Sequence, residues 1–358
     1  MPWIDWGPRP PLAYWLAVQT RAIVGKIAVL AAVAAAAGSV AACSAPASQH
    51  HVTAHRAARP AARARPRSAG VPGQPALSAS PPAADALDVT SAPRRVAAKA
   101  AALADAATGQ VLWSRGFNTE LPIGSITKVM TALLVIQTGH LDREISIPRA
   151  VLNYVAKYQA ESAGLYPGDI VTVQDLLEAM LLPSGCDAAY VLATTFGPGM
   201  PAFLAKMNAE ATALGMTHTH FTSPDGLPYP TEYSTYSTPH DLLILGMAAM
   251  RSPVFRAIVS QMFFHLPKGK HHHSYWWDNT NGLIGNYPGA DGIKTGYTAA
   301  AEHCLLFEAV RHGVPLIGVV LGSPVTGPDA AAEAAANVLN WGFSLRPAAT
   351  GAQAAGTS

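Results

Sequence analysis

A helix that has to be buried on all sides is the feature that most constrains how this chain can fold. Seven of the eight residues after Gly124-Ser125-Ile126-Thr127-Lys128 are apolar, which predicts a core helix that ends near Gly139. A helix without a polar face must be covered on every side, so the remaining elements have to pack around it. Ser125 and Lys128 would lie on one face of its first turn, where free backbone N–H groups and the helix dipole favour developing negative charge.

The pairing of Ser125 with Lys128 allows nucleophilic chemistry but does not establish it. A serine hydroxyl is a weak nucleophile until a base takes its proton, and a lysine is such a base only where burial or a second cation lowers its pKa. A single Ser-x-x-Lys tetrapeptide also arises by chance, as an ordinary helix start with a solvated lysine. Its significance therefore depends on what stands further along the chain.

The first 43 residues predict a signal peptide or an N-terminal anchor. Arg21 and Lys26 precede an apolar run, residues 27–40, which has the length of a secretory segment. The run ends in Val40-Ala41-Ala42-Cys43, which resembles a bacterial lipobox with Cys43 as the lipidated residue. Ordinary cleavage at the small residues and an uncleaved anchor remain alternatives. We expect a protein secreted across the cytoplasmic membrane and associated with the cell envelope, held there through Cys43 in the lipidated alternative.

Composition divides the rest of the chain into a linker, one domain and a tail. Residues 44–95 contain eight prolines, seven arginines and no Phe, Trp or Tyr. They cannot bury enough apolar surface to offset their ordering entropy, so they predict a disordered Pro/Ala/Arg-rich linker. Residues 96–345 form the predicted folded domain, and residues 346–358 a flexible tail. The formal charge of +2 over 358 residues gives no general argument for nucleic-acid binding.

The pattern of strands and helices in residues 96–345 predicts an α/β fold of the α+β type. Strand patterns stand at both ends of the domain with helical patterns between them, and a capping box at Thr172-Val173-Gln174-Asp175 opens one helix. An antiparallel sheet flanked by helices, with a mostly helical lobe, satisfies this order. A cleft between lobe and sheet is the natural site. The predicted strands span residues 98–105, 110–115, 293–296, 303–310 and 315–322, and the predicted helices span 172–182, 200–214, 239–250 and 329–341.

Two further motifs give the Ser-x-x-Lys tetrapeptide its significance. Ser184-Gly185-Cys186 follows a predicted helix, and Lys294-Thr295-Gly296 opens a predicted strand. The three motifs, in this order and these contexts, resemble those of serine penicillin-binding proteins and class A β-lactamases. Flanking segments resemble the low-molecular-mass penicillin-binding proteins, the D-alanyl-D-alanine carboxypeptidases. This resemblance covers roughly residues 96–322, and its segments include 176–189, 214–221, 224–227, 279–281 and 289–298.

The resemblance implies a cofactor-free, metal-free monomeric enzyme. It would remove the terminal D-alanine from peptidoglycan stem pentapeptides through an acyl-serine, in the cell envelope, and would be inhibited by β-lactam antibiotics. It implies Ser125 as nucleophile, Lys128 as base and Ser184 as proton relay. The implied substrate-binding groups are Cys186, the Lys294 ammonium and Thr295 hydroxyl for the carboxylate, Gly296 for close approach to the strand edge, and Tyr297, whose N–H would complete an oxyanion hole with that of Ser125.

Two departures from the family pattern leave alternatives open. Cys186 stands where the family usually has Asn, and a thiol is a weak hydrogen-bonding group, so about 1 kcal/mol of substrate positioning would be lost. A catalytically weak or inactive wall-binding relative is therefore one alternative. No arginine stands between Arg311 and Arg346, where some relatives carry one for the carboxylate.

A β-lactamase is a further alternative. The class A deacylating motif is missing, because neither Glu210 nor Glu232 has an Asn four residues later. A zinc site at His271-His272-His273 is disfavoured against a polar loop or a hairpin tip, since three consecutive residues cannot easily all face one ion. Whether Cys186 and Cys304 form a disulfide stays open at this point.

Overall fold

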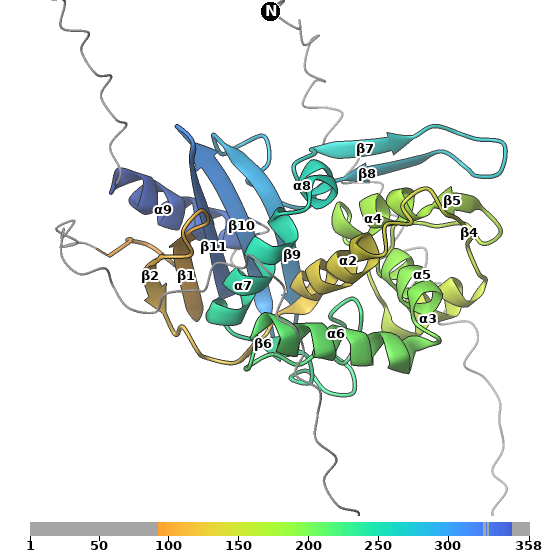
Figure 1. Cartoon of the computed structure of the whole chain (residues 1–358), viewed down its shortest axis with the longest axis horizontal. Coiled ribbons are helices and arrows are strands. Elements are labelled where there is room, and N and C mark those ends of the chain that lie inside the picture. Colours follow the sequence, from red (N-terminus) through yellow and green to blue (C-terminus); the bar gives the residue numbers. More distant parts are fainter. Residues whose placement is uncertain (1–91, 325–326, 328, 346–358) are drawn as a thin grey trace, which may run out of the picture. The chain divides into compact units, whose positions relative to one another are not determined.

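The central sheet joins the first strands of the domain to its last ones (Figure 1). Its five strands are antiparallel and lie in the order β2-β1-β11-β10-β9, so β9 is an edge strand. The computed structural model describes residues 92–324, 327 and 329–345. The strands are β1 (Ala100–Asp105), β2 (Val111–Arg115), β9 (Ala290–Thr298), β10 (Glu302–Arg311) and β11 (Val314–Ser323).

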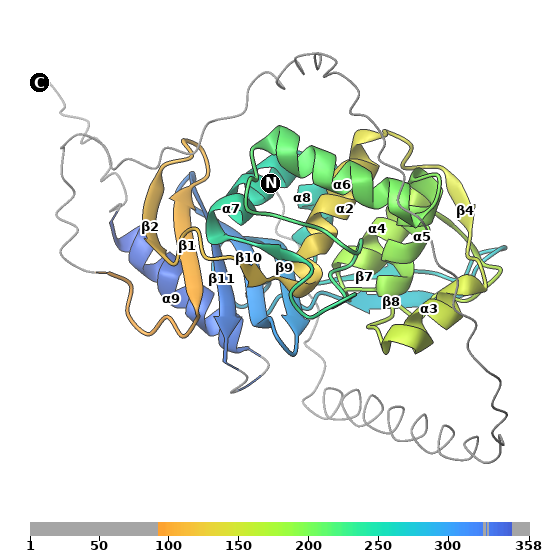
Figure 2. The same cartoon turned by 90° about the horizontal axis from the view of Figure 1, so that it is seen from below.

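Helices cover both faces of this sheet. Helix α9 (Ala330–Ser344) packs on one face against Leu103, Phe307 and their neighbours. Helix α7 (Pro239–Met250) covers the other face, with the rest of the helical lobe beyond it (Figure 2). Successive side chains of a strand point to opposite faces, which explains why the central strands are apolar almost throughout.

Helix α2 (Lys128–Gln137) is the buried helix that the sequence predicts. Seven of its ten residues are buried, and it contacts α4, α5, α6, α7 and α8. Its start differs from the prediction, because Gly124–Thr127 form a 3-10 turn, η1, and the α-helix begins only at Lys128. A tight 3-10 turn is a common helix start. The other lobe helices are α3 (Ala150–Tyr158), α4 (Val173–Leu181), α5 (Cys186–Phe196), α6 (Met200–Leu214) and α8 (Pro253–Val259).

Several predicted elements are confirmed by the structure, and others were missed. The capping box at Thr172 is present with both of its hydrogen bonds. Helices α6 and α7 have the predicted bounds, and α9 ends three residues later than predicted. The sequence did not indicate α3, α5 or α8, nor the short strands outside the central sheet. These pair as β3 (Leu121–Pro122) with β6 (Tyr236–Ser237), β4 (Glu144–Ser146) with β5 (Ile170–Thr172), and β7 (Phe263–Leu266) with β8 (Tyr275–Asp278).

The histidine run lies at the tip of the β7–β8 hairpin, which is one of the two predicted alternatives, a polar loop or a hairpin tip. His273 Nδ1 is 2.9 Å from Asp169 Oδ1, which ties the tip to the lobe. Within residues 92–324, 327 and 329–345, no three His, Cys, Asp or Glu side chains gather as a metal site. Trp277 on β8 is buried, whereas Trp276 on the opposite face is 54% exposed.

The predictions for residues 1–43, for most of the 44–95 linker and for the 346–358 tail lie outside the described residues. No single helix in the described part of the chain is long and apolar enough to cross a membrane. Two bent pairs, α5 with α6 and α7 with α8, meet that criterion only when taken together.

Candidate active site

The 3-10 turn that carries Ser125 holds this serine against a buried lysine. Ser125 lies in η1, and Lys128 opens α2 one turn later. Lys128 Nζ is hydrogen bonded to Ser125 Oγ at 2.8 Å, and its side chain is completely buried. A buried ammonium or amine has to be surrounded by polar partners, because desolvation without them is costly. The three-residue spacing read from the sequence therefore places the two groups in direct contact.

Two distant segments supply the remaining partners of Lys128. Its Nζ lies 3.4 Å from Ser184 Oγ and 3.4 Å from Cys186 Sγ. It also donates a 3.1 Å hydrogen bond to the carbonyl oxygen of Asp225. The predicted convergence of Ser125, Lys128, Ser184 and Cys186 is thus what the fold produces.

A strained turn presents Ser184 to the lysine. Ser184 has φ +68°, a left-handed conformation that a non-glycine residue adopts only when its surroundings hold it there. The surroundings are supplied by Asp187, in the first turn of α5. Its carboxylate accepts hydrogen bonds from Ser162 Oγ at 2.6 Å and from the Ala163 N–H at 2.9 Å, which fastens the turn to the segment after α3.

The edge strand β9 brings the second lysine to the same place. Lys294 is only 1% exposed, and its Nζ lies 3.2 Å from Thr295 Oγ1. Burial lowers the pKa of Lys294 well below its ordinary value, and the nearby Lys128 lowers it further. Thr295 Oγ1 is also 2.7 Å from Thr280 Oγ1, so a hydroxyl pair stands beside the ammonium. Lys294 and Thr295, the predicted anchor for the carboxylate of the substrate, thus lie side by side.

Gly296 is required for a reason that the sequence did not reveal. A Cβ on Gly296 would lie 2.3 Å from the carbonyl oxygen of Ile123, and a Cβ on Gly124 would lie 2.8 Å from the backbone nitrogen of Tyr297. Glycine therefore lets β9 pack directly against the turn that carries Ser125. The sequence predicted that glycine at this position lets the substrate backbone approach closely. The structure adds a second reason, which is the close packing of Gly296 against the turn within the protein. Gly296 lines the cleft as well.

The thiol of Cys186 is neutral and buried. It is 2% exposed, and burial raises the pKa of Cys186 to about 12, although the adjacent Lys128 opposes that shift. A neutral thiol is a weak donor and a weak acceptor. Both Cys186 and Cys304 are free cysteines, so the open question of a disulfide between them is answered in the negative.

The sequence did not indicate the hydrogen bonds that hold the carbonyl group of Asp225 in place. Tyr154 Oη on α3 donates a 2.8 Å hydrogen bond to Asp225 Oδ2, and the Leu227 N–H donates to Oδ1 at 3.2 Å. Thr131 Oγ1 on α2 donates a 2.6 Å bond to the carbonyl of Pro224. Asp225 was noted only as part of a family-like segment, and nothing in the local sequence links it to Tyr154.

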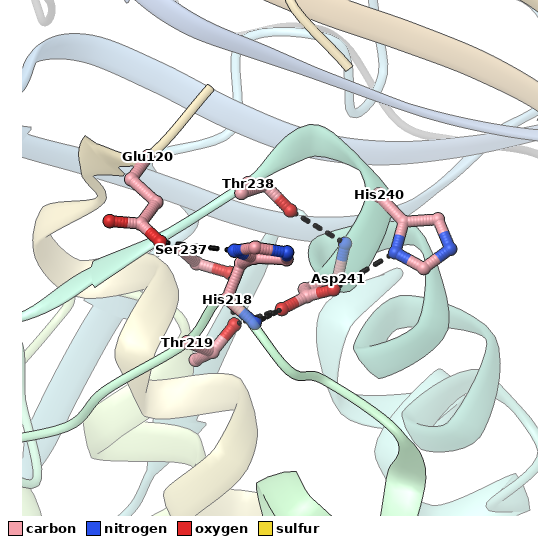
Figure 3. Close-up of polar contacts among 7 residues, drawn as sticks. All are labelled: Glu120, His218, Thr219, Ser237, Thr238, His240 and Asp241. Atoms are coloured by element: carbon pink, nitrogen blue, oxygen red, sulfur yellow. Dashed lines mark hydrogen bonds and ion pairs between the residues drawn. The ribbon is translucent and has the colours of Figure 1, made fainter. Parts of the chain in front are cut away.

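A second buried carboxylate anchors the segment that leads to Asp225 (Figure 3). Asp241 Oδ2, on α7, accepts the His218 N–H and the Thr219 hydroxyl, each at 2.8 Å. Its own N–H donates to Thr238 Oγ1, and its Oδ1 lies 2.9 Å from His240 Nδ1. The Asp241 side chain is completely buried, and these bonds satisfy it. The network therefore fixes residues 218–219 against the helix start.

The converging groups open into a cleft of about 680 Å³ between lobe and sheet. Tyr297, on β9, has a side chain that is 54% exposed at this cleft. Asp329, at the start of α9, also lines it. A carboxylate therefore lines this part of the cleft. The arginine that some relatives carry for the substrate carboxylate has no counterpart between Arg311 and Arg346. Two further carboxylates, Glu161 and Glu232, line the walls of the cleft.

This arrangement defines a class of protein. A serine hydroxyl bonded to a buried lysine, with a second hydroxyl and a second lysine beside an edge strand, is the equipment of a serine acyl-transfer enzyme. The profile of the peptidase S11 family, D-alanyl-D-alanine carboxypeptidase, matches residues 87–325. The chain belongs to that family, and the family predicted from the sequence is confirmed.

Similar proteins agree with this assignment. The D-alanyl-D-alanine carboxypeptidase of Streptomyces sp. strain K15 is 39% identical over 250 residues, which cover 66% of this chain and 84% of that protein. The Mycobacterium tuberculosis D-alanyl-D-alanine carboxypeptidase DacB2 is 39% identical over 251 residues, which cover 69% and 83%. The crystal structure of the Streptomyces K15 DD-transpeptidase matches with a TM-score of 0.67 at 38% identity, covering 71% of this chain and all of that one. The predicted fold is thereby confirmed.

Proposed function

We propose that this chain removes the terminal D-alanine from peptidoglycan stem pentapeptides through an acyl-serine intermediate. The observation that carries the proposal is the 2.8 Å bond between Lys128 Nζ and Ser125 Oγ, inside a cleft that also presents Lys294. Membership of the D-alanyl-D-alanine carboxypeptidase family supports the substrate and the reaction.

Acylation uses the contacts already described. Lys128 takes the hydroxyl proton as Ser125 Oγ attacks the carbonyl carbon of the penultimate D-alanine. Lys294 and Thr295 hold the terminal carboxylate. The N–H groups of Ser125 and Tyr297 stabilise the developing oxyanion, a contribution worth about 10²–10³ in rate per donor in other enzymes.

Release and hydrolysis complete the cycle. Ser184, which contacts Lys128, passes a proton to the nitrogen of the departing D-alanine. Water then attacks the acyl-serine and releases the shortened peptide. A penicillin carries an amide carbonyl in its β-lactam ring and a carboxylate on the fused ring, and both fit the same groups, so these antibiotics acylate Ser125 and inhibit the enzyme.

The decisive experiment measures D-alanine release from a pentapeptide ending in D-alanyl-D-alanine. The wild type releases D-alanine, whereas Ser125→Ala and Lys128→Ala do not. Equal release from the wild type and Ser125→Ala refutes the mechanism. Labelling of Ser125 by fluorescent penicillin without any release identifies an inactive wall-binding relative, and rapid penicillin turnover identifies a β-lactamase.

Transpeptidation is a second candidate activity, favoured by the similarity to a solved structure named a DD-transpeptidase. The acyl-serine would then be attacked by the amine of a second peptide in place of water. Addition of an amino-acid acceptor to the reaction distinguishes the two, because transfer yields a longer peptide that mass spectrometry detects. If no lengthened peptide forms at high acceptor concentration, transfer is excluded.

The proposed location follows from the substrate. We place the enzyme outside the cytoplasmic membrane as a monomer in the cell envelope, lipid-anchored through Cys43 or released after cleavage. Metabolic labelling with a fatty acid separates these forms, because only the lipidated form incorporates label and Cys43→Ala abolishes it. Incorporation that survives Cys43→Ala rules out this anchor.

A further inference from the structure

Lys294 is a buried lysine that has to carry a charge in the proposed mechanism. Its side chain is only 1% exposed, and burial together with Lys128 lowers the pKa of Lys294 well below its ordinary value. A neutral amine holds a carboxylate more weakly than an ammonium group does. The carboxylate anchor therefore needs a nearby anion that keeps Lys294 protonated before the substrate binds.

The elements around Lys294 carry several acidic or thiol groups that are already neutral or engaged. These groups are Cys186 on α5, Asp225 beside Lys128, Asp291 on β9 and Glu308 on β10. The thiol of Cys186 is neutral, because burial raises the pKa of Cys186 to about 12. The carboxylate of Asp225 accepts the hydroxyl of Tyr154. Asp291 and Glu308 both pair with Arg256.

Glu161, in the segment after α3, is fixed at the wall of the cleft. Its carbonyl oxygen accepts the Cys186 N–H at 2.8 Å. The next two residues, Ser162 and Ala163, donate hydrogen bonds of 2.6 and 2.9 Å to the carboxylate of Asp187. These bonds hold the backbone of Glu161 beside the residue whose thiol contacts the catalytic cluster. The Glu161 side chain itself is exposed and lines the cleft.

We propose that Glu161 is a positioning residue that keeps Lys294 cationic until the substrate carboxylate binds. Burial and Lys128 lower the pKa of Lys294, and the charge of Glu161 opposes both. The ion pairs among residues 92–324, 327 and 329–345 do not include Glu161, so its charge acts on the cleft undiminished by a cationic partner. This inference rests on the proposed function, which assigns Lys294 to the substrate carboxylate.

The test measures how the preference for a charged carboxylate depends on pH. Acylation of Ser125 by benzylpenicillin and by its methyl ester is followed by mass spectrometry from pH 6 to 10. The ratio of the two rates isolates the contribution of Lys294, because Lys128 serves both ligands. This ratio should fall as pH rises and Lys294 loses its proton. In Glu161→Gln the fall should come about half a pH unit lower, as for charges several Å apart near water, and less so at high salt.

Two further variants show whether the shift belongs to Glu161. Glu232→Gln removes another carboxylate of the cleft wall, one that accepts the Ala300 N–H at 3.3 Å, and should keep the wild-type profile. Glu161→Asp retains the charge and should restore most of that profile. An unchanged profile in Glu161→Gln, or an equal shift in Glu232→Gln, overturns the assignment. A ratio raised equally at every pH also overturns it, because Glu161 would then only repel the ligand carboxylate.

Release of D-alanine from a pentapeptide separates this inference from the proposed function. If no D-alanine is released while the acylation profiles shift as described, the proposed function fails and the assignment of Glu161 stands. If D-alanine is released and the profiles coincide, only the assignment of Glu161 fails. A chain that neither ligand acylates contradicts both.

Discussion

Tyr154 holds Asp225 in the position from which the carbonyl of Asp225 meets the buried Lys128. The hydroxyl of Tyr154 donates a 2.8 Å hydrogen bond to the carboxylate, and the carbonyl oxygen of the same aspartate accepts one from Lys128 at 3.1 Å. Asp225 is 1% exposed, so its buried carboxylate needs hydrogen-bond partners within the protein. Tyr154 thus affects the position of Lys128 only through Asp225. In the contacts described it touches neither Ser125 nor Lys128.

Tyr154→Phe should lower kcat/KM for D-alanine release about tenfold. Removing one partner of a buried charged group costs about 1–3 kcal/mol, and part of that cost appears as a misplaced Asp225 carbonyl. Tyr190→Phe removes a hydroxyl from the ring packed beside Tyr154, at 4.7 Å between centroids, and is the matched control. Steady-state kinetics over a range of pH and thermal melting are measured together. A drop in melting temperature with unchanged kinetics would assign Tyr154 a purely structural part.

Cys186→Asn should raise kcat/KM about fivefold. The amide can donate to the substrate and accept from Lys128, whereas the neutral thiol does both weakly, and one ordinary net hydrogen bond is worth about 1 kcal/mol. Cys186→Ala removes the thiol without supplying an amide, so it should give no gain. The rates of D-alanine release are compared at equal protein concentration. An asparagine variant slower than the alanine variant would contradict the expectation.

Glu178→Gln should stabilise the fold at pH 8 and have its smallest effect near pH 4.5. Burial raises the pKa of Glu178 on α4 from 4.5 to about 7, although Gln261 opposes the shift with hydrogen bonds of 3.1 Å. A raised folded-state pKa contributes stability below the unfolded value, and that stability is lost as pH rises through about 7. The wild type carries this cost at pH 8, on the order of 1–3 kcal/mol.

Urea unfolding at both pH values checks the sign of the Glu178 prediction. Glu210→Gln alters a half-buried glutamate whose hydrogen bond to Gln137 on α2 is exposed, and should change the free energy of unfolding little at either pH. If Glu178→Gln destabilises the protein more at pH 8 than at pH 4.5, the cost assigned to the buried carboxylate is wrong.

Asp241→Ala should lower the free energy of unfolding by about 2–4 kcal/mol. The substitution leaves the His218 N–H and the Thr219 hydroxyl without their buried acceptor, and it frees the segment that leads to Asp225. Glu120→Gln, at the exposed ion pair of the same network, should cost less than about 1 kcal/mol. Equal losses from both variants, measured by urea unfolding, would show that the buried carboxylate has no special importance.

Local sequence patterns predicted the parts of this fold that depend on local order. The apolar run after Lys128, the capping box at Thr172 and the strands after Gly292 each carry their own periodic or turn signal. The three motifs also fixed which residues meet in the cleft. Helix α3 and the pairing of Tyr154 with Asp225 were not predictable in this way. That contact joins residues 71 apart, and a polar pair formed by tertiary packing leaves no periodic trace in either segment.

The same limit applies to the backbone of the site. Ser184 adopts a left-handed conformation without being glycine, because Asp187 and the segment after α3 impose it. The need for glycine at Gly296 comes from the carbonyl of Ile123, 173 positions earlier in the numbering. Sequence motifs identified these residues, but the reasons for their identity lie in the three-dimensional contacts.

The unpaired edge of β9 has a consequence for the solubility of the protein. Backbone groups that accept an extended substrate also offer a template to any other extended chain, including a strand from a second copy. The 3-10 turn and the lobe packed against this edge restrict access to peptides slim enough to enter. Substitutions that detach the lobe from the sheet should therefore promote aggregation before they unfold the central strands.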